Sequence, residues 1–309
     1  MRHIIFNSNA SRFVSIAVVL FILVTLVSCE KEVNIDVQSG KPQLVVEGAI
    51  ETGLPPYVFL TNSLGYFSSI NLEKVQNAFV HDAEVYVSDG TKTVQLKEQQ
   101  LETGLPGMKL YVYTVQSLDM LGELEKNYKL TIKYNGEQYE AITKIPTPTK
   151  LDSVISIAPP FAPDNNPDVR QLKVFFKDPD TLGNHVRYFT RRFNGEKKDE
   201  PFYPGLAPSV YSDEIINGTQ FQAIFPLGEM PGTTTGFDSL GFAYPGDTVE
   251  LKWCAINKAT YDFYSTFEFS INSLGNPFAA PTRLSSNISN KAIGIWAGYG
   301  SIYTQVVVK

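Results

Sequence analysis

Cysteine and histidine are scarce in this chain, which argues against the commonest kinds of metal and nucleophile site. The 309 residues include two cysteines and three histidines. A zinc site needs clustered Cys and His ligands, so the sequence supports none, and we expect no cofactor. No Gly-x-Ser-x-Gly elbow, phosphate-binding glycine loop or dinucleotide-binding fingerprint is present. We therefore do not expect an enzyme, although the paired carboxylates of a hydrolase can come together without any sequence motif.

The chain also lacks a hydrophobic run long enough to cross a bilayer as a helix. The hydrophobic stretch at residues 13–27 has about 15 residues, whereas a membrane-spanning helix needs about 20. It follows Arg2 and Arg12 and ends immediately before Ser28 and Cys29. A basic start, a short apolar segment and a small residue at the cleavage point are typical of a secretory signal peptide.

The small residue before Cys29 resembles the bacterial lipobox, at which the cysteine thiol is acylated, as with palmitate, and the preceding residues are removed. We therefore interpret residues 1–28 as a lipoprotein signal peptide and Cys29 as the lipid-bearing first residue of the mature protein. An ordinary N-terminal membrane anchor with a chance cysteine is the alternative.

Residues 29–41 are polar and acidic, and we interpret them as a tether between the lipid and the folded body. Acidic residues close behind an acylated cysteine resemble the surface-export signal of Bacteroidota lipoproteins, although Val33 interrupts the run. We therefore expect a lipid anchor in the outer membrane, with exposure at the cell surface favoured over a periplasm-facing position.

The mature chain has no excess of positive charge. Removal of Arg2 and Arg12 leaves 24 basic and 32 acidic side chains, a formal net charge of −8 rather than −6. Such a body is repelled by phosphate backbones, so nucleic acid is not an expected partner. With Cys29 acylated, Cys254 has no partner for a disulfide, and we expect it to be a small buried residue on a strand.

Strand-forming and turn-forming residues, by contrast, are abundant. Segments with strand periodicity alternate with turn signals such as Asn135-Gly136 in the first part of the body. These segments are residues 43–50, 57–61, 83–88, 91–96, 109–113, 128–134 and 138–143. About seven short strands at this spacing predict an immunoglobulin-like or transthyretin-like β-sandwich over residues 42–145. Residues 63–75 are predicted to be a long loop with at most one helical turn.

Two alternating prolines in residues 146–150 predict a linker, because proline stiffens a connector and cannot donate to a sheet. Residues 151–309 then contain further strand segments and are predicted to form a second β-rich domain. One helix is expected over residues 258–273, where aromatic and aliphatic side chains share a face. Two closing strands are expected over residues 294–299 and 301–308. The predicted fold class is therefore all-β in the main, with this one helix.

Several segments of the mature chain resemble those of the DUF4249 lipoproteins, in the same order. They are Leu44-Val45-Val46-Glu47-Gly48, Phe176-Lys177-Asp178-Pro179, Tyr261-Asp262-Phe263-Tyr264, Asn276-Pro277-Phe278 and Ser286-Asn287-Ile288. The resemblance covers nearly the whole mature chain. It implies an outer-membrane lipoprotein, often encoded beside a TonB-dependent receptor. It implies no catalytic residues, because the family has no assigned function.

Two patterns mark candidate sites that also have a simpler explanation. Asp178, Asp180 and Asn184 offer oxygen ligands to a hard cation such as calcium. Asp and Asn between strands more often form turns by bonding to nearby backbone, so no metal is predicted and this set stays a candidate. A recurring tripeptide, Asp followed by Ser or Thr and an aliphatic residue, resembles the O-glycosylation acceptor of Bacteroidota, with strand entry as the alternative. Its hydroxyl residues are Ser153, Thr181, Ser239 and Thr248.

These observations favour a non-enzymatic outer-membrane lipoprotein that acts as a partner or binding module of a TonB-dependent transporter. Aromatic side chains supply rigid contact area at interfaces, although each one can instead close the end of a domain. The candidates in loops and Gly/Pro-rich segments are Tyr66, Phe67, Phe202, Tyr203, Phe237, Phe242 and Tyr244. A free-standing surface adhesin or glycan-binding lipoprotein is the alternative, followed by a hydrolase without a recognisable motif.

Overall fold

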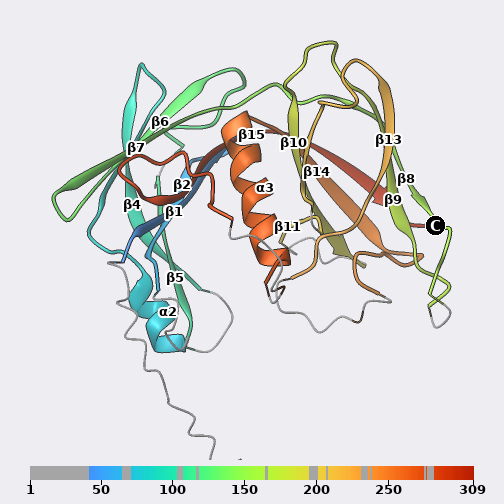
Figure 1. Ribbon diagram of the computed structural model, residues 1–309, viewed down its shortest axis with the longest axis horizontal. Helices are drawn as coiled ribbons and strands as arrows, with labels where there is room; N and C mark the ends of the chain where they lie inside the picture. Colours follow the sequence, from blue (N-terminus) through green and yellow to red (C-terminus); the bar gives the residue numbers. More distant parts are fainter. Residues whose placement is uncertain are drawn as a thin grey trace, which may run out of the picture. The chain divides into compact units, whose positions relative to one another are not determined.

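The computed structural model describes residues 42–64, 71–102, 107–115, 118–163, 166–194, 201–206, 208–230, 236, 239–274, 276 and 282–309 (Figure 1). The signal peptide, Cys29 and the tether lie outside these residues, as do the contact candidates Tyr66, Phe67 and Phe237. All described elements belong to one compact unit, residues 41–309. Among them, no helix has both the length and the apolar character that crossing a membrane requires.

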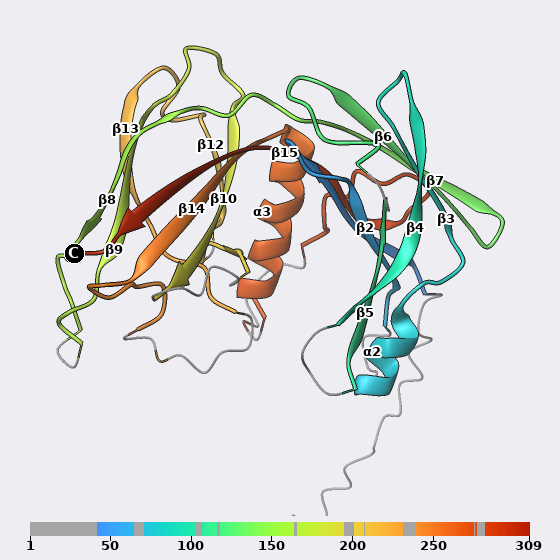
Figure 2. The ribbon, with the colours of Figure 1, turned by 180° about the vertical axis from the view of Figure 1, so that it is seen from behind.

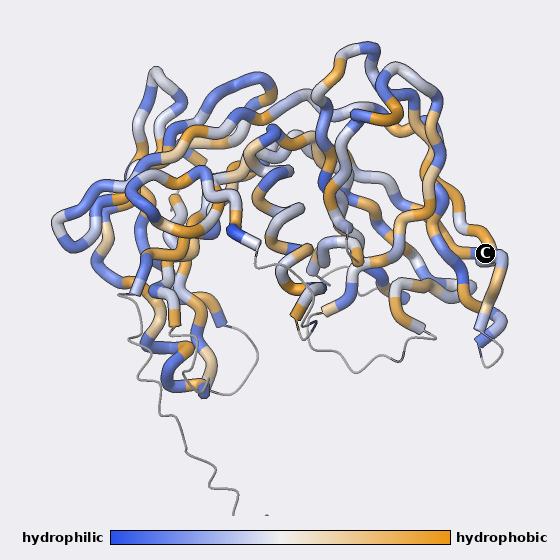
Figure 3. Tube along the Cα trace, viewed as in Figure 1, coloured by the Kyte–Doolittle hydropathy of each residue, from blue (hydrophilic) through white to orange (hydrophobic). Residues whose placement is uncertain are grey.

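The described part of the chain is mainly β, which confirms the predicted fold class. The first part contributes β1 (Leu44–Glu51), β2 (Tyr57–Asn62), β3 (Glu84–Ser88), β4 (Thr93–Glu102), β5 (Lys109–Thr114), β6 (Asn127–Tyr134) and β7 (Glu137–Lys144). Hydrophobic and hydrophilic residues alternate along these strands (Figure 3). The loop predicted over residues 63–75 is shorter than expected, because helix α2 (Leu72–Ala78) begins after Asn71, whose side chain accepts the Lys74 backbone N–H.

Strand β4 joins two layers of sheet in this first part. Its beginning pairs with β3 and its end pairs with β5. One layer therefore contains β1, β2 and β5, and the other contains β3, β6 and β7. Apolar side chains from both layers pack together in one core, among them Val46, Leu60, Val85 and Ile132.

The second part pairs a sheet with a smaller one and covers its other face with a helix. Its elements are β8 (Leu151–Ile157), β9 (Gln171–Lys177), β10 (His185–Phe193), β11 (Tyr203–Pro204), β12 (Val210–Ser212), β13 (Gln220–Phe225), β14 (Thr248–Ile256), α3 (Lys258–Asn272) and β15 (Ile293–Val307). Strands β13, β9 and β8 form the small sheet. Figure 2 shows α3 beside β10, β14 and β15.

Alternation along β14 decides which side chains face each layer. Leu251 and Trp253 pack with Phe176 of the small sheet, whereas Cys254 and Ile256 pack with the α3 side chains. Cys254 is fully buried, and burial raises the pKa of its thiol to about 12. Helix α3 confirms the predicted helix at residues 258–273, and its cap is Asn257, which accepts the Thr260 backbone N–H at 2.9 Å.

The C-terminal strand belongs to both parts. Residues 293–299 of β15 pair in parallel with β1, and its later residues pair antiparallel with β14. Trp296 of this strand lies in the first core, where its Nε1 donates to the Tyr128 carbonyl at 3.0 Å. The prediction of two closing strands is therefore wrong, since one continuous strand is present. The division into two domains stays a prediction, but the large sheet extends through both parts, because β15 pairs with β1 on one side and with β14 on the other.

Thr147, in the predicted linker, is held by Glu125. The Glu125 carboxylate accepts hydrogen bonds from the Thr147 backbone N–H at 2.8 Å and from its hydroxyl at 2.7 Å. It also pairs with Lys144 at 2.5 Å. The hydrogen bonds from Lys144 and Thr147 lower the pKa of Glu125 to about 2. Since the carboxylate stays ionised above that pH, this contact persists through mildly acidic conditions.

We expect Glu125→Ala to make trypsin cut severalfold faster after Lys144 and Lys150, because the segment between them loses its anchor at Thr147. The measurement is limited proteolysis at pH 7 followed by mass spectrometry. Glu123→Ala is the matched control, because Glu123 pairs with Lys126 at 2.7 Å and not with the linker. Equal cutting rates in the two variants would show that the anchor does not restrain the segment.

Candidate functional site

An apolar pocket of about 240 Å³ lies between the two sheets of the second part. It is located near the end of β9, where the loop of residues 178–184 leads into β10. Strands β9, β10, β12, β13 and β14 supply its walls together with two loops. The lining residues are Phe176, Asp178, Asn184, Val186, Tyr211, Ser212, Asp213, Ile215, Ile216, Phe221, Phe225 and Trp253.

The walls of this pocket are largely aromatic. Trp253 packs against Phe176 and Phe225, with ring centroids 5.3 Å apart in both pairs. Phe221 and Tyr211 extend the aromatic wall, with centroids 5.7 Å from Phe176 and 5.2 Å from Phe225 respectively. The alternation of β14 places Trp253 here, because every second residue of that strand faces the small sheet.

Trp253 carries a buried polar atom without a partner. The residue is 1% exposed, and its indole Nε1 has no hydrogen-bond acceptor among the described residues. A buried donor left unsatisfied costs about 1–3 kcal/mol. The contrast with Trp296, whose Nε1 donates to Tyr128, shows that the fold satisfies the other indole. The indole N–H of Trp253 is therefore an unsatisfied buried donor within the described part of the protein.

Two buried carboxylates border the pocket. Asp213 is 2% exposed and accepts the backbone N–H groups of Gly183 and Asn184, each at 2.9 Å. Asp178 is 4% exposed and accepts the Gly218 N–H at 3.2 Å. These bonds fix the loop of residues 178–184 against the turn that follows β12. On the pocket rim, Ile215 is 95% exposed, so an apolar side chain lies open to solvent beside the carboxylates.

The electrostatics of the two carboxylates differ. Burial raises the pKa of Asp178, and the negative charges of Asp213 and Asp180 raise it further. Burial acts in the same direction on Asp213, but the N–H groups of Asn184 and Gly183 hold its pKa below the usual range. No Lys, Arg or His side chain pairs with Asp178, Asp180 or Asp213 within the described ranges. This side of the pocket is therefore negative and lacks a cation.

Calcium binding by Asp178, Asp180 and Asn184 stays a prediction, although Asp178 and Asn184 already make hydrogen bonds within the protein. The Asn184 side-chain amide donates to the Thr181 carbonyl and to Asp213. Asp213, which the sequence analysis did not single out, is the residue that closes this loop. In the part of the chain that the structure describes, no group of three or more His, Cys, Asp or Glu side chains is arranged to hold a metal ion.

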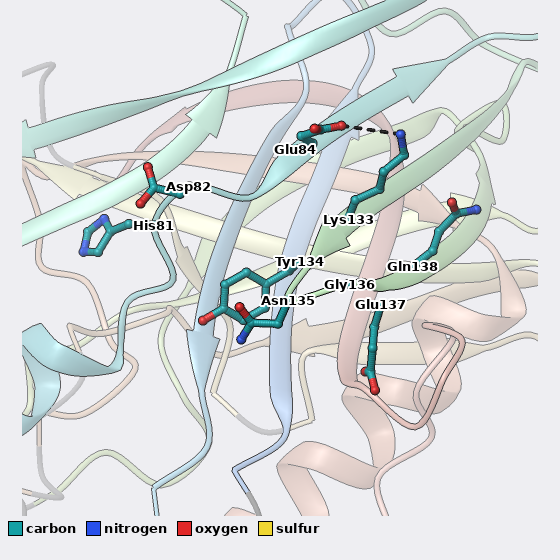
Figure 4. Close-up of a pocket in the computed structure, with 9 residues that line it drawn as sticks. All are labelled: His81, Asp82, Glu84, Lys133, Tyr134, Asn135, Gly136, Glu137 and Gln138. Atoms are coloured by element: carbon teal, nitrogen blue, oxygen red, sulfur yellow. Dashed lines mark hydrogen bonds and ion pairs between the residues drawn. The ribbon is translucent and has the colours of Figure 1, made fainter.

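A second hollow, of about 600 Å³, lies in the first part beside the β6–β7 turn (Figure 4). Its walls are mainly polar, and some of its charged groups form ion pairs. Lys133 lies 3.4 Å from Glu84, and His81 pairs with Glu98. The predicted turn at Asn135 is present here, with a positive φ of 51°. None of the described residues that line this hollow has a buried side-chain N or O atom without a partner, so we do not regard the hollow as the functional site.

A third polar cluster lies on the sheet face that α3 covers, and its groups are satisfied within the protein. Arg187 donates to the Tyr299 hydroxyl at 2.8 Å, and its guanidinium lies 3.2 Å from the centre of the Tyr264 ring. Lys252 pairs with Glu51 at 2.5 Å, and Glu51 also accepts the Tyr303 hydroxyl at 2.5 Å. This cluster joins β1 to β14 and β15, so its role is structural.

Four of the predicted contact aromatics lie in described residues, and all four are half-buried. Phe202 lies 4.6 Å from the Arg191 guanidinium, and the Tyr244 hydroxyl accepts a hydrogen bond from Asn166 at 2.9 Å. The other two are Tyr203 and Phe242. These contacts are internal, and a role in partner binding stays a prediction.

The O-glycosylation candidates occupy different environments. Ser153 and Thr181 are exposed, whereas Ser239 and Thr248 are half-buried. Their modification also stays a prediction.

Comparison with known proteins identifies the family but no characterised relative. No match to this chain was found among curated proteins. The family model described as Domain of unknown function (DUF4249) matches residues 30–304. That match covers most of the chain and agrees with the resemblance carried by the segments from Leu44 onward. The chain therefore belongs to the DUF4249 family.

Proposed function

We propose that the protein is a non-enzymatic binding module, anchored in the outer membrane through a lipid on Cys29, that acts as a partner of a TonB-dependent transporter. The observation that carries the binding role is the apolar pocket beside Trp253. Ligand sites are typically concave, lined by hydrophobic and aromatic side chains, and equipped with a few polar groups that orient the ligand. The pocket has aromatic walls, two carboxylates at its border and an unpartnered N–H.

The placement at the membrane is supported by the sequence before the folded body. The basic start, short apolar segment and Ser28-Cys29 pair are those of a lipoprotein signal peptide. The acidic tether favours surface exposure over a periplasm-facing position. The transporter as partner is supported by the resemblance to DUF4249 lipoproteins, which are often encoded beside such receptors.

We expect the wild-type protein to incorporate a fatty-acid probe and Cys29→Ala to incorporate none, because the Cys29 thiol is the acyl acceptor. The measurement is metabolic labelling in the native host. Cys254→Ala is the matched control, since it removes the other cysteine, which is fully buried. Labelling that survives Cys29→Ala would end the lipoprotein interpretation.

Membranes of the same host also allow a test of the association with a transporter. Extraction in a mild detergent should recover the wild-type protein with a large β-barrel in stoichiometric amount. Recovery of the lipoprotein without a barrel would contradict the transporter partnership and favour a free-standing adhesin or glycan-binding protein.

A further inference from the structure

We propose that the pocket beside Trp253 binds a small quaternary ammonium compound. This inference rests on the proposed binding role and names the class of ligand. Two independent features of the pocket converge on this class: unpaired negative charge and aromatic walls.

The first feature is the charge at the pocket border. Asp178 and Asp213 line the pocket, both are almost fully buried, and neither has a cationic partner among the described residues. Asp213 is engaged by the backbone of Gly183 and Asn184, whereas Asp178 accepts one backbone N–H, from Gly218. Bringing a positive charge to Asp178 would offset the desolvation and the repulsion that raise its pKa. An anionic ligand would meet repulsion at the same place.

The second feature is the composition of the walls. Five of the lining side chains are aromatic: Phe176, Tyr211, Phe221, Phe225 and Trp253. Aromatic faces attract organic cations through the ring quadrupole, and cages of aromatic residues recognise quaternary ammonium groups. A primary ammonium fits less well, because outside the carboxylates at the border the apolar walls supply no acceptors for its three N–H groups. Methylated ammonium groups lack those N–H groups.

The pocket volume limits the size of the molecule. About 240 Å³ corresponds to the volume of roughly eight water molecules, which suits a compound of fewer than about ten non-hydrogen atoms. Choline combines the required charge and methyl groups at this size.

The test is a calorimetric titration of the purified mature lipoprotein in detergent with three probes. It measures the affinity for each probe. The probes are choline; 3,3-dimethylbutan-1-ol, which has the same shape without the charge; and ethyltrimethylammonium, which keeps the charge without the oxygen. We expect saturable binding of choline. The neutral alcohol should bind at least about tenfold more weakly, because it lacks both the attraction between the cation and the carboxylate and the cation–π contact with the aromatic walls.

Two substitutions assign the contributions to residues. Asp178→Asn should lower the affinity for choline by about tenfold or more and leave the neutral alcohol unaffected. Asp152→Asn is its control, because it removes one negative charge from an exposed residue of β8 that does not line the pocket. Trp253→Phe replaces the indole by a smaller ring and should weaken choline and ethyltrimethylammonium alike, because both lose aromatic contact area. Thermal denaturation of each variant confirms that it is folded.

The outcomes separate this inference from the proposed function. Equal binding of choline and the neutral alcohol to the wild-type protein would overturn the ammonium class and leave a binding pocket. Unchanged choline affinity in a folded Asp178→Asn variant would also overturn the inference. If none of the three probes binds, the inference fails, while recovery of a β-barrel with the protein still tests the transporter partnership separately.

Discussion

Replacing Gly294 by alanine should destabilise the protein by about 4 kcal/mol or prevent folding altogether. Gly294 is the second residue of β15 and pairs with Val46 of β1. Its φ is +135°, a conformation in which L side chains are strained. A Cβ at this position would lie 1.8 Å from the Val46 carbonyl oxygen. That contact is with backbone and cannot be relieved by turning a side chain, so β15 would have to move away from β1.

The measurement is the free energy of unfolding from urea denaturation of the purified protein. Gly246→Ala is the matched control, because Gly246 also has a positive φ, of +93°, and a Cβ there meets nothing within 4 Å. In this control only the backbone strain of a side chain at positive φ remains, so we expect it to lose about 1 kcal/mol of unfolding free energy or slightly more. If both variants lost the same stability, the close approach of β15 to β1 would not matter for the fold.

Lys252→Met should cost about 3–5 kcal/mol, because it leaves the Glu51 carboxylate buried without its cation. Glu51 is 7% exposed, and the remaining partner of its carboxylate in the cluster described above is the Tyr303 hydroxyl. The double variant Glu51→Gln with Lys252→Met should recover most of this loss, since no buried charge remains. Urea denaturation of the two single variants and the double variant measures the coupling.

Lys133→Met provides the control for a pair at the surface. Lys133 and Glu84 lie 3.4 Å apart, and about half of each side chain is exposed to solvent. Exposed pairs contribute about 0–1 kcal/mol, so this variant should be close to wild type. A double variant as unstable as Lys252→Met alone would show that packing of the lysine stem, and not its charge, stabilises this region.

The strands and the helix at residues 258–273 could be predicted because their patterns are local. Alternation along residues 128–134 and 138–143, with a turn at Asn135, is written in consecutive residues and needs no knowledge of partners. The sequence predicts two strands in place of β15, because Gly298 and Gly300 interrupt its pattern and glycine usually marks a turn or a bend. In the structure these glycines allow close backbone approach, since a Cβ would lie 2.3 Å from the Lys144 oxygen and 1.8 Å from the Pro146 oxygen respectively.

The pocket could be predicted less well than the fold. Asp178 and Asn184 can be recognised as candidate ligands because they lie in one loop. Asp213 lies about 30 residues further along the chain, and no local pattern marks it. Trp253 has the signature of an ordinary buried strand residue, and the lack of an acceptor for its N–H depends on what the small sheet brings near it. Such a feature depends on distant segments, and no motif in the chain encodes it.

The parallel pairing of β1 with β15 has a consequence for how the body is assembled. Strands β1 and β15 are direct neighbours although most of the folded body separates them in the sequence, so this pairing forms only after β15 has been synthesised. Closing a loop of this length is slow because the entropy of the intervening chain must be lost before the contact forms. Until then, the side of β1 that β15 will occupy presents unpaired N–H and C=O groups, which attract other strands. A chain cut short before Ile293 would lack β15 and would leave that edge of β1 open to pairing with strands of other molecules.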